Sequence, residues 1–126
     1  MKVVAASLLV ALAACSSGPS GPDLPPPKNT EAGTLAQTCA EVQRGITTFN
    51  NEDYLATMEH FKRAEVYAKV HARKWGSPEA ASLLQAVDYY AHLPAKIYPS
   101  AARSSDDFRR YTVAMLEQCG KDGADT

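Results

Sequence analysis

Apolar side chains recur at intervals of three or four residues in four segments between Leu35 and Cys119. The first segment carries them at Leu35, Cys39, Val42, Ile46 and Phe49. This spacing puts the apolar residues on one face of an α-helix, whereas a half-buried strand would alternate with a period of two. Because no stretch of the chain alternates convincingly, the pattern predicts an all-α domain.

The second segment has boundary signals at both ends. Asn50 and Asn51 interrupt the first stripe, and Glu52 and Asp53 then place negative charge where the dipole of a new helix favours it. Gly76 follows the segment as a C-cap residue. The buried stripe of this second helix is expected at Tyr54, Met58, Phe61, Ala64, Ala68, Ala72 and Trp75.

The third segment begins at Ser77 and Pro78, a pair typical of an N-cap residue followed by the first helical position. Pro94 ends this helix, since proline cannot continue one. Its core residues are expected at Ala80, Leu83, Leu84, Val87, Tyr90 and Ala91.

The last helix is predicted to start at Ser104 or Ser105 and to stop at Gly120. Its apolar face holds Phe108, Thr112, Met115 and Cys119. Residues 94–103 are expected to form a connection with a short helical turn around Ala95–Tyr98. Four helices joined in this way predict an antiparallel four-helix bundle over residues 33–120, followed by a disordered tail at 121–126.

The first residues are typical of an export signal. Lys2 supplies a positive start, and Val3 to Ala14 is an uncharged stretch rich in Val, Leu and Ala. As a helix this stretch would span roughly 18 Å, well short of the roughly 30 Å of a hydrocarbon core. We therefore expect a signal peptide over residues 1–14 and not a permanent membrane span.

Leu12-Ala13-Ala14-Cys15 resembles the lipobox of bacterial lipoproteins. The resemblance implies cleavage before Cys15, a diacylglyceryl group on its sulfur, and an N-acyl chain such as palmitate as a further modification. It also implies a lipid-anchored protein on the extracytoplasmic side of the cell membrane, with no cofactor beyond this covalent lipid. The alternative is an ordinary signal peptide cut after Ala13, with Cys15 incidental.

The other two cysteines are expected to pair. An oxidising compartment favours disulfides, and assigning Cys15 to lipid leaves Cys39 and Cys119. In the predicted bundle these two lie near the start of the first helix and the end of the fourth, which are at the same end. The alternative is a pair of separately buried thiols.

Residues 15–32 are rich in Pro, Gly and Ser and have no apolar periodicity. This composition predicts a flexible, lipidated tether between the membrane and the bundle. Its run Pro25-Pro26-Pro27 is a weak signal for docking a partner as a polyproline helix.

Residues 38–71 resemble a single tetratricopeptide-like helix hairpin, through Gly45, Tyr54, Phe61 and Ala64. Thr57, Glu41 and Lys69 replace the small, aromatic and proline residues of that repeat, and no second copy follows. Because a solenoid needs about three repeats to bury its core, simple packing of a helix hairpin explains the same residues.

No catalytic site is predicted. His60, His71 and His92 are not spaced as helical His or Cys ligand pairs, so no metal is expected. The acidic pair Asp106 and Asp107 suits a helix start. With 13 Lys and Arg against 14 Asp and Glu, the net charge of −1 also gives no footprint for nucleic acid.

Glu65 is the polar residue that most needs an explanation, because it falls inside the apolar stripe of the second helix. Three accounts fit: pairing with Arg44, Arg109 or Arg110, lining a groove, or extending from the edge of the stripe to solvent. Val66, Tyr67 and Val70 make the same helix apolar over more than one face.

These features favour a lipid-anchored, non-enzymatic envelope protein that binds or scaffolds an envelope protein or polymer. The alternative is a binder of small apolar ligands, with an aromatic cleft between the second and third helices. Five aromatic residues would line this cleft: Tyr67, Trp75, Tyr89, Tyr90 and Tyr98. The candidate contacts to a ligand or partner are Glu65, Tyr67, Trp75, Tyr89 and Tyr90.

Overall fold

The computed structural model describes residues 24–123, and every regular element within that range is helical. The elements are α2 (Glu31–Asn50), α3 (Tyr54–Trp75), α4 (Pro78–Ala91), the 3-10 turn η1 (Ala95–Ile97), α5 (Tyr98–Ser104) and α6 (Asp106–Gly123). The predicted all-α class is therefore confirmed.

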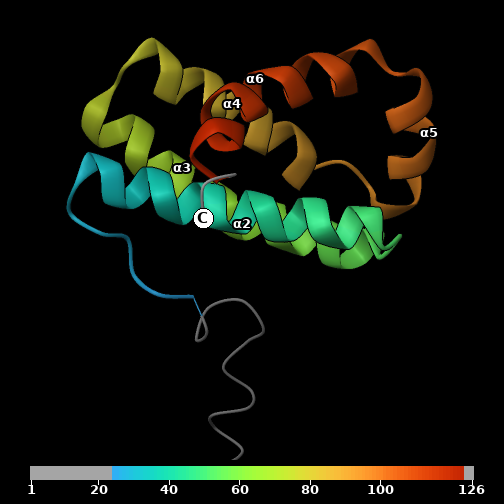
Figure 1. Ribbon diagram of the computed structural model, residues 1–126, viewed down its shortest axis with the longest axis horizontal. Helices are drawn as coiled ribbons and strands as arrows, with labels where there is room; N and C mark the ends of the chain where they lie inside the picture. The colour runs from blue at the N-terminus through green and yellow to red at the C-terminus, as the bar shows by residue number, and fades with distance from the viewer. Residues whose placement is uncertain (1–23, 124–126) are drawn as a thin grey trace, which may run out of the picture.

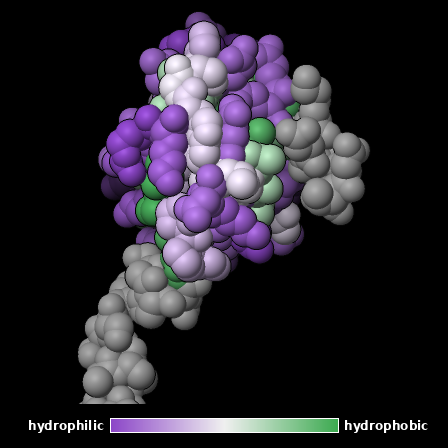
Figure 2. All heavy atoms as spheres, turned by 90° about the vertical axis from the view of Figure 1, so that its left-hand side faces the viewer, coloured by the Kyte–Doolittle hydropathy of each residue, from purple (hydrophilic) through white to green (hydrophobic). Residues whose placement is uncertain are grey.

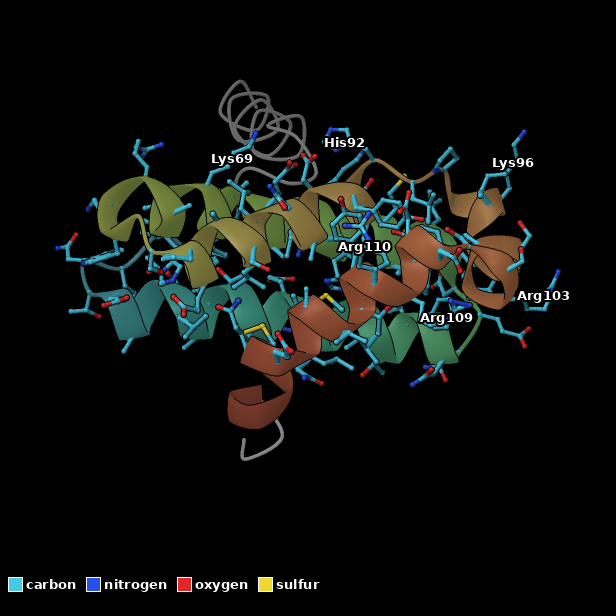
Figure 3. All side chains as sticks on the ribbon, turned by 90° about the horizontal axis from the view of Figure 1, so that it is seen from above. Lys69, His92, Lys96, Arg103, Arg109 and Arg110 are labelled. Carbon is cyan, nitrogen blue, oxygen red and sulfur yellow. A yellow bond between two sulfur atoms is a disulfide. The ribbon has the colours of Figure 1, made fainter. Side chains whose placement is uncertain are left out.

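The long helices form two layers. In Figure 1, α2 and α3 run antiparallel along the bottom of the molecule, and α4 and α6 lie above them. The short α5 turns the chain at the end of α4, and α6 then returns across the bundle at an oblique angle (Figure 3). This is the predicted four-helix bundle with an additional corner helix.

Local signals start and stop these helices as predicted. The Asp53 side chain accepts a hydrogen bond from the first turn of α3, and Ser77 does the same for α4. Ser105 Oγ accepts the Phe108 N–H at 3.1 Å at the start of α6. Gly76 ends α3 with a left-handed φ of 42°, a conformation that costs glycine little.

Two predicted boundaries are wrong. The first bundle helix begins at Glu31 rather than Gly33, because the side chain of Thr30 caps it by accepting the Gly33 N–H. The last helix continues through Gly120 to Gly123. Glycine ends a helix only where the backbone turns left-handed, and among the described glycines Gly76 alone does so.

The connection between the third and fourth predicted helices is more helical than expected. The predicted turn is present as η1, and α5 follows it directly. Tyr98 fixes this corner, because its ring is fully buried and its hydroxyl donates a hydrogen bond to the Tyr90 carbonyl. Pro99, in the first turn of α5, is compatible with a helix start.

One core is shared by all four long helices. Its buried members include Val42 on α2, Phe61 on α3, Val87 on α4 and Met115 on α6. A disulfide joins Cys39 on α2 to Cys119 on α6, with 5.1 Å between the two Cα atoms. The predicted pairing is confirmed, and it ties the fourth helix of the bundle to the first.

One end of the molecule is mainly polar. Figure 2 shows the end of the molecule at which α2 begins as largely hydrophilic, with small apolar spots. Within residues 24–123, no helix combines the length and the apolar character that a membrane span requires.

Candidate functional site

Part of the predicted tether is bound to the α2–α3 hairpin. The Gln37 amide donates to the Pro26 carbonyl at 3.0 Å and accepts the Lys28 N–H at 2.9 Å. The Tyr67 hydroxyl donates to the Pro25 carbonyl. Residues 25–28 therefore form a strap across the hairpin, and the tether boundary predicted at residue 32 lies too far along the chain. Cys15, the predicted lipidation site, lies outside the described residues.

The five aromatic residues of the predicted cleft do not gather around one space between α3 and α4. Tyr67 binds the strap, while Trp75 packs against the His71 ring at the end of α3, with 5.7 Å between the ring centroids. Tyr89 stacks on Tyr111 of α6 at 4.9 Å. Tyr90 and Tyr98 belong to the core, as described next.

Tyr90 and Tyr98 are buried with their hydroxyl groups satisfied. The Tyr90 hydroxyl donates to the Phe108 carbonyl at 2.7 Å and also contacts Thr112 Oγ1. Burial raises the pKa of both phenols well above its usual range. Both rings therefore stay neutral and act as packing elements with an internal hydrogen bond.

An apolar groove with a volume of about 190 Å³ opens on the other side of the bundle, between α2 and α6. Ile46 and Phe49 line it from α2, and Thr112, Met115 and Leu116 line it from α6. The inner wall includes the rings of Tyr90 and Tyr98. Sequence spacing did not predict this groove, because its position depends on the oblique angle at which α6 crosses α2.

Glu65 lies in a polar cluster between α3 and the end of α4. It is 8% exposed, and its Oε2 atom is buried without a hydrogen-bond partner. Asp88 and His92 face it, and one ligand-type atom from each of the three residues lies within 4.8 Å of the others. Lys69 Nζ is 3.9 Å from Glu65 Oε2, and Figure 3 shows Lys69 and His92 projecting from the same edge of the molecule.

The cluster shifts the protonation of its members. Burial raises the pKa of the Glu65 carboxyl, and the nearby Asp88 carboxylate raises that pKa further. The backbone carbonyl of Asp88 accepts a hydrogen bond from His92 and raises the pKa of the imidazole, as does the Asp88 carboxylate.

The partners expected for Glu65 are engaged elsewhere. Arg44 pairs with Glu41 at 2.9 Å, Arg109 with Asp106 at 2.9 Å and Arg110 with Asp107 at 2.7 Å. Because Glu65 is buried, it does not extend to solvent either. Of the three accounts, the structure contradicts arginine pairing and extension to solvent, and Glu65 lies instead beside Asp88, His92 and Lys69.

Sequence reasoning missed two features of this kind. Asp88 and His92 are four residues apart, a helical pairing that a search restricted to His and Cys overlooks. Glu41 is 5% exposed and binds His60 Nδ1 at 2.9 Å as well as Arg44. The contact between Glu41 and His60 gave no signal, because His60 comes from the neighbouring helix.

Compared with protein-family models, with curated proteins and with solved structures, the chain matches none of them.

Proposed function

We propose that the protein is a lipid-anchored component of the bacterial cell envelope that binds or scaffolds an envelope protein or polymer without catalysing a reaction. Cys15 carries the lipid, and the helical bundle is held on the extracytoplasmic side.

One observation carries this proposal: the disulfide joins the two cysteines that the lipobox leaves over. Disulfides between buried cysteines are typical of exported proteins and rare in the cytosol of most bacteria. The oxidised pair Cys39–Cys119 thus supports export, and the lipobox supports the form that export takes.

Membrane fractionation and lipid labelling test the anchor. Cys15→Ser is expected to abolish incorporation of a palmitate analogue and to release the chain from the membrane or leave it uncleaved. The matched control is the double variant Cys39→Ala/Cys119→Ala, which removes the other cysteines and should remain labelled. Continued anchoring of the Cys15→Ser chain would end the lipoprotein proposal.

Photocrosslinking in native membranes tests the binding role. Val113 and Leu116 are exposed apolar residues three positions apart on α6, which makes them suitable sites for the crosslinking group. Leu55 on α3 is also exposed and serves as the comparison site. Recovery of a specific envelope protein or polymer supports the proposal, whereas recovery of only lipid and self contradicts it.

A second candidate is a binder of small apolar ligands, and the α2–α6 groove is the observation that favours it. A cavity of about 150 Å³ can bind benzene, and this groove has about 190 Å³ with a largely apolar lining. Benzene should raise the melting temperature of the wild-type protein. Leu116→Trp, at the groove, should reduce this rise in melting temperature, whereas Val113→Trp should leave it unchanged. If benzene raises the melting temperature of both variants equally, the groove is not the ligand site.

A further inference from the structure

Glu65, Asp88 and His92 converge from two helices. Asp88 lies in the last turn of α4 and His92 directly follows that helix, so residues four positions apart share one face. Glu65 reaches the same point from α3. One carboxylate oxygen from each acid and one imidazole nitrogen lie within 4.8 Å of one another, close enough to contact a single ion.

The buried oxygen of Glu65 is a second sign that this cluster suits a cation. Glu65 Oε2 has no hydrogen-bond partner, although the residue is only 8% exposed. Leaving such an atom unpaired is costly in a protein interior. Lys69 does not satisfy it, since its Nζ is 3.9 Å away and its side chain is 61% exposed.

We propose that Glu65, Asp88 and His92 bind one divalent transition-metal ion, with Zn²⁺ as the principal candidate. One imidazole and two carboxylates form a donor set that suits zinc and its neighbours, whereas Mg²⁺ and Ca²⁺ favour oxygen ligands alone. Three protein ligands leave a coordination position for water or for a group on a binding partner.

The cluster is reached from solvent through its exposed members. Glu65 is the buried member, while the side chains of Asp88 and His92 are 53% and 67% exposed. Lys69 is the only cation within 4.0 Å of Glu65 among the described residues, and it competes with the metal for the Oε2 atom. This site is independent of the lipid anchor and of the α2–α6 groove.

Calorimetric titration of the full chain with Zn²⁺ tests the proposal, using detergent-solubilised protein without a histidine tag. We expect one ion per chain, with little competition from excess Mg²⁺. Each of Glu65→Gln, Asp88→Asn and His92→Ala should weaken binding about tenfold or more, because even supporting residues of metal sites have effects of about this size. Asp88→Asn changes an exposed side chain and so guards against a trivial loss of folding.

Two further variants separate this site from general binding by surface histidines. His60→Ala is the matched control, because His60 also contacts a buried glutamate, Glu41, but Arg44 occupies that carboxylate. It should bind Zn²⁺ like the wild type. Lys69→Met removes the competing charge and should tighten Zn²⁺ binding several-fold.

Weakening in the three ligand variants together with tightening in Lys69→Met supports the site. The proposal is overturned if the wild type does not bind Zn²⁺. It is also overturned if the three ligand variants bind as the wild type does, or if His60→Ala loses as much affinity as His92→Ala.

Discussion

At Gly45, the backbone of α2 lies close against the Phe61 ring of α3. A Cβ atom there would lie 2.8 Å from Cε2 of Phe61, whose ring is buried against Tyr90 at a centroid distance of 4.9 Å. Gly45→Ala should therefore destabilise the fold, because overpacking costs about 1–3 kcal/mol and the gain in helix propensity returns about 1 kcal/mol at most. Urea unfolding measures the difference.

Gly120→Ala is the matched control for that prediction. It also lies inside a helix, but its Cβ would meet Leu116 at an ordinary 3.4 Å. Because alanine favours a helix more than glycine does, the unfolding free energy should rise, by up to about 1 kcal/mol. Equal and favourable effects of both substitutions would show that α2 and α3 are not in contact at Gly45.

His71 predicts a pH dependence of stability. Its imidazole is buried and shares a hydrogen bond of 2.9 Å with Thr34 Oγ1, and burial lowers its pKa. As the pH falls through about 6.5, the unfolded chain takes up a proton that the folded chain resists, so stability is lost on acidification. Glu65 and His92 have raised pKa values and act in the opposite direction.

The contribution of His71 is isolated by comparison with His71→Gln, which cannot titrate. Between about pH 7.5 and about pH 5.5, the wild type should lose more unfolding free energy than the variant does. The shared contributions of Glu65 and His92 cancel in this difference. If the unfolding free energies of the wild type and His71→Gln change with pH in parallel, the His71 imidazole is not held buried and neutral.

At the residue scale, the sequence could identify Glu65 as unusual but not its surroundings. A carboxylate within an apolar stripe is visible on a helical wheel, whereas its neighbours Asp88 and His92 come from another helix. Their positions depend on how α3 packs on α4, and periodicity gives no information about this register. The same limit explains why the contact between Glu41 and His60 was missed.

The strap is the element whose attachment is easiest to test. Gln37→Ala removes both hydrogen bonds from the Gln37 amide to the strap backbone. Because these bonds are exposed, global stability should fall by less than about 1 kcal/mol. Hydrogen exchange of the Lys28 amide should accelerate strongly. Gln43→Ala, on the same helix, should leave the Lys28 exchange rate unchanged, and slow exchange in Gln37→Ala would refute the attachment.

The disulfide determines how firmly α6 is held. It closes a loop with a sequence separation of 80, so Cys39→Ala/Cys119→Ala should lower the unfolding free energy by up to about 4.5 kcal/mol in the chain-entropy model. Amide protection should fall more in α6 than in α3, because the bond fixes α6 to α2. Addition of a reductant to the wild type should likewise lower the unfolding free energy and the amide protection of α6. A urea midpoint that is the same with and without the disulfide would contradict this prediction.

At the element scale, prediction succeeded where the signal is local. Ser77, Gly76 and Ser105 act within one turn of themselves, and all three mark helix ends in the structure. The corner helix α5 was missed because its stability comes from Tyr98, whose buried contacts lie in the bundle core. The strap was missed because a proline-rich sequence predicts extended backbone and not the surface to which that backbone binds.

At the scale of the whole molecule, the aromatic residues show why a fold class does not define a site. The sequence predicts that Tyr89, Tyr90 and Tyr98 lie on or near helices, but Tyr90 and Tyr98 are buried in the core whereas Tyr89 stacks on Tyr111 of α6. Tyr90 and Tyr98 also form the inner wall of the groove between α2 and α6. This outcome depends on how the helices pack on one another, which helical periodicity does not specify.

The shared core predicts that the two layers unfold together. Buried side chains of all four long helices meet in one cluster, so neither the α2–α3 layer nor the α4–α6 layer keeps a complete core alone. Trp75, the single tryptophan, reports on the end of α3, whereas far-UV circular dichroism reports on every helix. With the disulfide intact, both signals should follow one urea transition with the same midpoint. A dichroism change that precedes the tryptophan change would mean that α4 and α6 leave first, and that the α2–α3 hairpin with its strap is a separately stable unit.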